Sequence, residues 1–571
     1  MAKQERTVTE LVAMIERGEL ALPEMQREYV WRSTRVRDLL DSLYRGYPSG
    51  VILTWQTNSD VAHNEFAVKT SGQAVGRPML LLDGQQRLTS LSAVLRGELV
   101  TVRGRKKPID ILFNLDHPDQ IGEVTEVVED GDEDVDEEAD GPDSDERDLQ
   151  ALMGLRTFIV SSKQLAALPN WVSVTDVMRT ASDSPFLKKA GVTGFDHPDY
   201  EKYTARLKRL RGIKDYVYRM DVLENSLTYS EVTEIFVRVN SLGAKLRSSD
   251  LALAQITARW PGSLAQFRDF QKSCAKTGYS LDLGTHLRML TALLTDQSRF
   301  ATVGSLDRAA LQDGWERAKR ALTHAINFMS ANVGVKSTAL LSSPFALIAL
   351  GYWADQRGFK PTIQEADGMR QWLLRANAKG RWSRGSSETL LDQDLAVMRD
   401  GGGPAQLTER LLTQVGRLDI TADDLQGRTS RSALFKTMFL AFSQDQARDW
   451  QTTLAISVTH AGKQDSLQFH HIFPRAYLRQ HHPDLKLSQV NDIANLAFIG
   501  GRTNQGISAA APSVYLAKLA QANPDLLTSQ QVPLDLGLYE ADRYLDFLAA
   551  RRELLAARLN RFLADPSKSP A

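Results

Sequence analysis

Four polar residues in the C-terminal part of the chain have the types and spacing needed to cleave a phosphodiester bond: His470, His471, Asn495 and Asn504. Such a cleavage needs a base for the attacking water and a divalent cation that holds the phosphate and stabilises the leaving oxygen. A neutral histidine suits the base, because its ordinary pKa of about 6.5 lies near working pH. We therefore expect His471 to be the base and Asn495 to pin the loop or the base. We expect His470 and Asn504 to hold Mg²⁺ or another divalent cation.

Two short apolar segments must position these side chains. Residues 467–472 predict a first strand, and residues 495–499 (NLAFI) predict a second. A Gly-Gly pair follows, and a helix is expected to begin within residues 502–504. The expected order is strand, loop, strand and helix. The alternative is that the histidines are satisfied structural residues. A structural zinc site is disfavoured, because the chain has one cysteine and no C-x-x-C.

A second set of polar residues lies near the N-terminus. Residues 79–82 predict a short apolar strand that leads directly into DGQQR, and leucines at helical spacing follow. A strand, a tight glycine turn and a helix together present free backbone N–H groups to a phosphate. Arg87 adds a forked donor for phosphate oxygens, and Asp83 could hold a metal or orient water. The alternative is a simple turn, in which Asp83 caps the helix and Arg87 pairs with a neighbouring acid.

Two further stretches accompany DGQQR: LPEMQREYVW (residues 22–31) and IFVRVNSLG (residues 235–243). Together they resemble the ParB-like N-terminal domain of GmrSD-type, modification-dependent (type IV) restriction endonucleases. In that family the partner domain is an HNH, or His-Me finger, nuclease, and the family pattern falls here on His470, His471, Asn495 and Asn504. The resemblance covers about the first 250 residues and about the last 120.

The resemblance implies that the N-terminal domain binds and hydrolyses a nucleoside triphosphate, ATP or GTP, and takes part in sensing modified DNA. The C-terminal domain would then be a ββα-metal nuclease. The implied nucleotide-binding residues are Gln26, Arg27, Asp83, Gly84, Gln85, Gln86, Arg87 and Asn240, and Asp83 is also the implied catalytic residue for hydrolysis.

Composition places the chain among ordinary globular proteins. It has 571 residues, 42% of them hydrophobic and 24% charged, so two to four domains are expected. No apolar run of about 18 residues predicts a membrane span, and the N-terminus MAKQERTVTE has no apolar signal core. The single cysteine, Cys274, excludes a disulfide framework. We therefore expect a cytoplasmic protein that does not bind membranes.

The net charge of −1 conceals a strong asymmetry. Residues 123–148 hold fifteen acidic residues and one arginine, so the rest of the chain carries a net charge of about +13. A basic folded part suits a nucleic-acid partner. We expect the acidic segment to be a disordered, solvated spacer within the first domain. The alternative is a DNA-mimicking plug that shields a basic groove until substrate arrives.

The middle of the chain, residues 228–445, shows apolar spacing of three and four and is predicted to be helical. The segment GRWSRG interrupts this pattern with Arg381, Trp382 and Arg384. These three residues could contact a phosphate backbone and stack on a base. The alternative is a salt-bridged loop.

These observations predict an α+β protein in three parts: a ParB-like α/β domain (residues 1–250), a helical connector (251–445) and an HNH domain (446–571). The expected activity is metal-dependent cleavage of foreign, modified double-stranded DNA, regulated by nucleotide. One alternative is a nucleotide-switched DNA-binding protein whose HNH module does not cleave, and another is an RNA-directed toxin nuclease. The sequence leaves open a homo-oligomer, the modification, the nucleotide, and nicking against double-strand cleavage.

Overall fold

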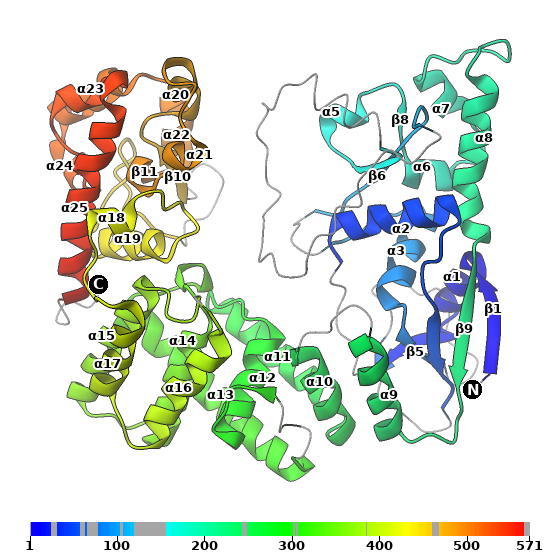
Figure 1. Ribbon diagram of the computed structural model, residues 1–571, viewed down its shortest axis with the longest axis horizontal. Helices are drawn as coiled ribbons and strands as arrows, with labels where there is room; N and C mark the ends of the chain where they lie inside the picture. Colours follow the sequence, from blue (N-terminus) through cyan, green and yellow to red (C-terminus); the bar gives the residue numbers. More distant parts are fainter. Residues whose placement is uncertain are drawn as a thin grey trace. The chain divides into compact units, whose positions relative to one another are not determined.

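The structure is a computed structural model that describes residues 2–23, 31–57, 63–64, 78–102, 107–118, 156–242, 248–300, 303, 306–383, 385–458 and 467–564. The chain forms two compact units, Met1–Gly262 (unit 1) and Ser263–Ala571 (unit 2) (Figure 1). Helices and small sheets are mixed, in agreement with the predicted α+β class. The division expected near residue 445 lies inside unit 2, and the acidic segment 123–148 lies outside the described residues.

Unit 1 is built on a six-stranded mixed sheet in the order β1-β9-β3-β5-β2-β4. The pairs β9–β3 and β5–β2 are parallel, and the other neighbouring pairs are antiparallel. A second, antiparallel sheet has the order β7-β6-β8. The strands are β1 (Ala2–Thr7), β2 (Leu20–Pro23), β3 (Ile52–Trp55), β4 (His63–Asn64), β5 (Met79–Asp83), β6 (Ile111–Asn114), β7 (Phe158–Val160), β8 (Trp171–Ser173) and β9 (Val217–Leu223).

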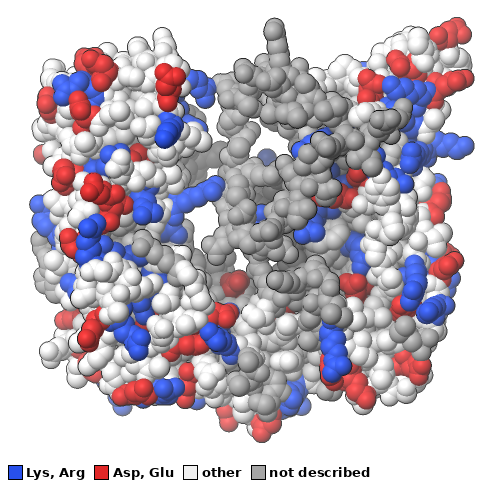
Figure 2. Space-filling view, viewed as in Figure 1, with Lys and Arg blue, Asp and Glu red and all other residues white. Residues whose placement is uncertain are grey.

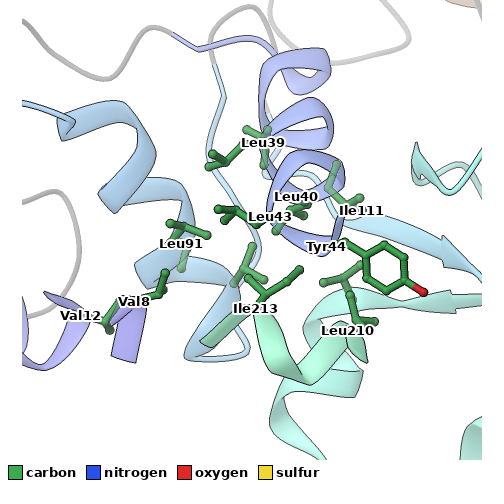
Figure 3. Packing of buried hydrophobic residues seen from close by; sticks show 14 of the residues in the cluster. Val8, Val12, Leu39, Leu40, Leu43, Tyr44, Leu91, Ile111, Leu210 and Ile213 are labelled. Atoms are coloured by element: carbon green, nitrogen blue, oxygen red, sulfur yellow. The ribbon is translucent and has the colours of Figure 1, made fainter. Parts of the chain in front are cut away.

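The helices of unit 1 enclose a continuous apolar core. Leu39, Leu40 and Leu43 lie on one face of α2 and pack with Leu91 of α3 and Ile213 of η1 (Figure 3). The helices are α1 (Val8–Glu16), α2 (Ser33–Arg45), α3 (Gln85–Leu95), α5 (Lys163–Ala166), α6 (Val174–Arg179), α7 (Ser184–Lys189), α8 (Tyr200–Arg211), η1 (Gly212–Asp215), α9 (Tyr229–Leu242) and α10 (Ser248–Arg259).

The ends of the first two helices test local sequence signals. Thr7 and Glu10 form the capping box that their spacing predicts at the start of α1. Gly46 ends α2 in the left-handed conformation that glycine adopts without strain. Ser33 does not cap α2: it is the first helical residue, and Arg32 occupies the cap position without a side-chain cap bond.

Unit 2 begins with a bundle of helices around large buried aromatic residues, among them Trp315, Trp353 and Trp372. The apolar spacing predicted in the middle of the chain lies on α12, α14 and α15. These elements are α11 (Ser263–Lys276), α12 (Leu283–Thr295), α13 (Arg308–Phe328), η3 (Met329–Val333), η4 (Thr338–Leu340), α14 (Phe345–Gln356), α15 (Ile363–Ala378), α16 (Ser387–Arg399), α17 (Pro404–Val415), α18 (Ala422–Leu425) and α19 (Ala433–Gln444).

The rest of unit 2 combines a two-stranded sheet with helices, and its last helix, α25, lies beside α18 and α19 (Figure 1). The elements are β10 (Leu467–His471), α20 (Arg475–His481), α21 (Leu487–Val490), η5 (Ile493–Asn495), β11 (Leu496–Gly500), α22 (Gly501–Ile507), α23 (Pro512–Ala522), α24 (Pro524–Thr528), η6 (Leu536–Tyr539), η7 (Ala541–Arg543) and α25 (Tyr544–Ala564).

The surface carries both signs of charge. On the face drawn in Figure 2, Lys and Arg side chains are interspersed with Asp and Glu side chains over both units. Within the described ranges, no helix is both long and apolar enough to cross a membrane.

Candidate active site

The predicted strand, loop, strand and helix are present in unit 2. β10 and β11 pair antiparallel, with His470 opposite Ala497 and His471 opposite Leu496, and α22 follows β11 directly. One detail differs from the prediction: Asn495 does not open the second strand but ends the 3-10 turn η5. His470 and His471 are the last two residues of β10, so their side chains leave the strand on opposite faces.

His470 lies among three aromatic or amide partners. Its side chain is buried, with 3% of the residue exposed. Nδ1 lies 2.9 Å from Oδ1 of Asn504 on α22, and Nε2 lies 3.3 Å from the Tyr515 hydroxyl on α23. The Trp450 ring packs edge-on against the imidazole. The structure therefore brings together His470 and Asn504, the two residues predicted to hold a divalent cation.

The hydrogen bonds of the neighbouring residues define what each offers to the His470 ring. Tyr515 donates its hydroxyl proton to the Ile472 carbonyl at 2.6 Å, and Asn504 donates through Nδ2 to Gln468 Oε1 at 2.7 Å. Both residues therefore present oxygen lone pairs to the His470 ring. Burial lowers the pKa of His470 to about 4, so the ring is neutral and carries one N–H. The shorter contact is therefore a hydrogen bond in which Nδ1–H donates to Asn504 Oδ1 at 2.9 Å. A cation bound by both residues would replace that proton, which would move to Nε2 beside the Tyr515 oxygen.

The spacing of His470 Nδ1 and Asn504 Oδ1 can be compared with that of two ligands of a divalent cation. Two neighbouring ligands of octahedral Mg²⁺, each about 2.0–2.1 Å from the ion, lie about 2.9 Å apart. The distance between His470 Nδ1 and Asn504 Oδ1 matches that separation. Within the described part of the chain, no group of three or more His, Cys, Asp or Glu side chains could hold a metal ion. A cation here would therefore take its remaining ligands from water and a substrate phosphate, as Mg²⁺ commonly does.

His471, the predicted base, is held by a residue that the sequence analysis did not identify. Its Nε2 donates to Oδ1 of Asn491 at 3.0 Å, which leaves Nδ1 as the basic nitrogen. Burial lowers the pKa of His471, the bond to Asn491 raises it, and the charge of Arg475 lowers it further, with a net decrease. A neutral, oriented imidazole is the form that a general base requires.

Asn495 fixes the loop rather than the base. It is fully buried, and its Oδ1 accepts from the Phe473 backbone N–H at 2.8 Å. Its Nδ2 donates to the carbonyls of Phe473, at 3.2 Å, and Val490, at 2.9 Å. These bonds join the segment after His471 to the segment that carries Asn491. Of the two roles considered for Asn495, the structure therefore shows loop pinning.

The strand and helix of the site are held by residues that precede them in the chain. Asp449 accepts from the Gly500 backbone N–H at 2.7 Å and from the Thr503 hydroxyl at 2.6 Å, so it fixes the first turn of α22. The ring of Phe498 on β11 packs against Phe435, Phe439 and Phe442 of α19. No spacing rule in the sequence links Asp449 or α19 to the site, because these contacts form only when distant segments pack together in the fold.

The DGQQR turn of unit 1 has the predicted strand, glycine turn and helix. Gly84 has φ 101°, a conformation that favours glycine. Arg87 donates to Asp83 Oδ2 at 2.8 Å and to the backbone carbonyls of Ser49, at 2.6 Å, and Val51, at 3.0 Å. This is the ion pair of the alternative interpretation. Asp83 does not cap the helix, because Gly84 occupies the cap position.

The structure describes some of the other implied nucleotide-binding residues and not others. Gln86 is buried and accepts from the Trp31 backbone N–H at 3.2 Å. Gln85 is buried, and its Oε1 has no hydrogen-bond partner among the described residues. Gln26 and Arg27 lie outside the described residues, and Asn240 is placed on α9 without a described side chain.

The structure contradicts the prediction that Arg381 and Trp382 contact DNA. Arg381 is 1% exposed and Trp382 is 2% exposed. Arg381 forms an ion pair with the fully buried Asp394 at 2.6 Å, and Trp382 Nε1 donates to the same carboxylate at 3.0 Å. Both side chains therefore stabilise the loop between α15 and α16 and cannot reach DNA. The salt-bridged loop is the correct interpretation for these two residues, and Arg384 lies outside the described residues.

Comparison with known proteins indicates the class. Residues 8–257 match the family model for the N-terminal domain of the GmrSD restriction endonuclease. The matched range ends within α10, close to the end of unit 1. This match supports a relation to the GmrSD-type restriction family, which indicates a restriction endonuclease of a phage-defence type with DNA as its substrate.

A second comparison extends through both units. Over 552 residues, the chain is 21% identical to the uncharacterized protein MJ0686 of Methanocaldococcus jannaschii. The alignment covers 90% of this chain and 87% of that protein. The similarity therefore includes the part of the chain that carries His470 and His471.

Proposed function

We propose that this protein is a metal-dependent DNA endonuclease of the HNH type, whose cutting centre is formed by β10, the following loop and α22. The observation that carries the proposal is the pair of contacts His470–Asn504 and His471–Asn491. One pair places two proposed cation ligands 2.9 Å apart, and the other holds a neutral base in a fixed orientation. A general base beside a cation site is the minimum needed to hydrolyse a phosphodiester.

Each residue has a defined task in this proposal. His471 takes the proton of the attacking water at Nδ1, and Asn491 keeps the imidazole in the tautomer with the proton on Nε2. His470 and Asn504 would hold the divalent cation in place of the proton they share, and the Tyr515 oxygen would accept the ring proton at Nε2. The bound cation supplies charge stabilisation for the scissile phosphate and the leaving oxygen. Asn495 keeps the two sides of the loop together.

We further propose that unit 1 licenses cleavage. A nuclease centre that contacts mainly the DNA backbone does not discriminate between host and foreign DNA. The GmrSD-type match of residues 8–257 supports a sensing role for this unit. The turn from Asp83 to Arg87 is the proposed site for ATP or GTP, and Gln26, Arg27, Gly84, Gln85, Gln86 and Asn240 are the other proposed nucleotide-binding residues. The DNA that we propose is recognised is foreign, modified double-stranded DNA. The buried, unpartnered Gln85 Oε1 leaves a polar group at this turn that a ligand could satisfy.

The test is digestion of matched modified and unmodified DNA by the full chain, with and without nucleoside triphosphate and Mg²⁺. The wild type should cut the modified DNA preferentially, only with Mg²⁺, and faster with nucleotide. His471→Ala should bind both DNAs and cut neither. Cutting by His471→Ala at the wild-type rate would refute the assigned centre. Equal cutting of both DNAs by the wild type would refute the sensing role, and RNA cleavage in place of DNA cleavage would favour a toxin nuclease.

A further inference from the structure

Next to Asn491, which orients the proposed base, lies a carboxylate to which the reaction assigns no chemical step. Asp492 is fully buried, with 0% of the residue exposed. Its Oδ1 accepts from the Ala494 backbone N–H at 2.9 Å, and its Oδ2 accepts from the Gly427 backbone N–H at 2.8 Å. Oδ2 also accepts from Nη2 of Arg552 on α25 at 2.6 Å. A buried charge with these partners fixes the backbone on either side of it.

The turn that contains Asn491 is therefore held from two directions within unit 2. The loop after α18 holds it through Gly427 and through the Arg428 carbonyl, which accepts from the Ile493 N–H at 2.7 Å. The helix α25 holds it through Arg552 and through the Tyr544 hydroxyl, which donates to the Gln489 carbonyl at 2.8 Å.

The neighbouring arginine extends this support to β11. Arg551 is fully buried and donates through Nη1 to the carbonyls of Ala494 and Leu496, both at 2.8 Å. These carbonyls flank Asn495. Through Nη2 and Nε, Arg551 also donates to the carbonyls of Gln530, at 2.9 Å, and Gln531, at 3.2 Å. Consecutive arginines of one helix thus hold the turn beside the base and the strand that follows it.

We propose that Arg552 and Asp492 are positioning residues for the nuclease centre: their ion pair fixes the Asn491 turn, so that Asn491 holds the His471 imidazole in the reactive orientation. This inference rests on the proposed function, because it assigns to the C-terminal helix a task in the same reaction. Arg552 is bonded to the buried carboxylate, and its side chain is only 13% exposed, so its contribution acts through the turn.

The experiment compares Arg552→Met with the wild type in the full chain, in steady-state DNA cleavage with Mg²⁺. Methionine keeps an apolar stem and removes the charge. We expect kcat per folded molecule to fall by about 10²-fold, as small misplacements of a catalytic group do, while KM for DNA stays unchanged. Arg552→Lys, which keeps the charge, should recover most of the rate. Asp492→Asn removes the charge and keeps one acceptor oxygen for the backbone N–H groups, and it should show the same selective loss of kcat.

A double-mutant cycle with Asn491→Ala identifies the route of the effect. If Arg552 acts through Asn491, the double variant should cut no more slowly than Asn491→Ala alone. The matched control is Arg558→Met on the same helix. Arg558 forms an ion pair with Asp445, at 2.5 Å, and donates to the Ala441 carbonyl at 3.0 Å. It should lower Tm while leaving kcat per folded molecule unchanged.

The outcomes separate this inference from the proposed function. An unchanged kcat per folded molecule in Arg552→Met and Asp492→Asn overturns the positioning role, even if Tm falls. Multiplied losses in the double variant overturn it as well, because they show independent effects. Wild-type cutting by His471→Ala would instead overturn the proposed function, with or without an effect of Arg552.

Discussion

The DGQQR turn of unit 1 and the histidine centre of unit 2 both combine a strand end with a helix start, but they treat their polar groups differently. In the turn, Arg87 donates to Asp83 and to two backbone carbonyls of its own unit. In the histidine centre, His470 Nδ1 donates to Asn504 Oδ1 at 2.9 Å. The first arrangement is an ion pair with backbone support, and the second is a hydrogen bond between two neutral groups that we propose as cation ligands.

The comparison teaches that residue type alone does not distinguish a binding group from a structural one. The cluster of Arg381 and Trp382 has the composition of a DNA contact, yet one buried carboxylate, Asp394, satisfies both side chains. Buried polar groups must find partners, so the informative ones are those whose partners are incompatible with their protons or missing. Among the described residues, Gln85 Oε1 is such a group in unit 1.

The largest expected effect concerns His470 and Asn504, the proposed cation ligands. His470→Ala and Asn504→Ala should each lower the rate of DNA cleavage by about 10²–10³-fold. Each removes a proposed ligand of the divalent cation that would stabilise the leaving oxygen. Both variants should need more Mg²⁺ for half-maximal rate, and EDTA should stop the wild type. The measurement is cleavage rate against Mg²⁺ concentration, with the exposed His481→Ala as control. Full wild-type activity in EDTA would contradict the assignment.

A second prediction tests whether Arg381 is a structural residue or a DNA-binding one. Arg381→Ala leaves the buried Asp394 without its cation, and we expect the free energy of unfolding to fall by about 3–5 kcal/mol. The affinity for DNA should not change where the variant remains folded. Denaturant unfolding and DNA titration check both statements. The control is Arg417→Ala, a surface ion pair with Asp424, for which about 0–1 kcal/mol is expected. Weaker DNA binding with unchanged stability would restore the DNA role.

A smaller effect concerns the pH dependence of cleavage. The pKa of His471 is lowered by burial, so the base stays deprotonated below its ordinary range and the rate should fall only at pH values below about 6.5. The bond to Asn491 raises this pKa and the charge of Arg475 lowers it. Asn491→Ala should therefore move the acid limb to lower pH, and Arg475→Ala should move it to higher pH. Profiles of kcat/KM at saturating Mg²⁺ test both signs, and shifts in the same direction would contradict the account.

The sequence predicted the elements of the nuclease centre well, because short apolar segments and a Gly-Gly turn are local signals. β10, β11 and α22 lie within one or two residues of their predicted positions. Asn491 was missed because it follows a four-residue helix in an irregular loop, where no periodicity marks it. An Asn-Asp pair directly after that helix was the available signal, since such residues favour turns.

Contacts between distant segments account for the predictions that failed or were incomplete. Asp394 lies within α16, thirteen residues after Arg381, and reaches it only because α16 packs against the loop that carries Arg381. The helix α19 supports β11 although it ends before residue 446, where the nuclease domain was expected to start. Asp449, which supports α22, lies only three residues after that expected start. Sequence spacing cannot report such pairings, because they depend on how helices pack.

The most direct test of the central claim measures DNA cleavage and nucleoside triphosphate hydrolysis on the same preparations of two full-length variants, His471→Ala and Arg87→Ala. Arg17→Ala, an exposed surface pair with Glu19 in unit 1, serves as control. The account predicts that His471→Ala loses cleavage by about 10²–10⁴-fold and keeps hydrolysis. Arg87→Ala should lose hydrolysis and the nucleotide dependence of cleavage, with rates taken per folded molecule because Arg87 also ties the turn to Ser49 and Val51. Loss of both activities together in His471→Ala, or cleavage by that variant at the wild-type rate, would contradict it.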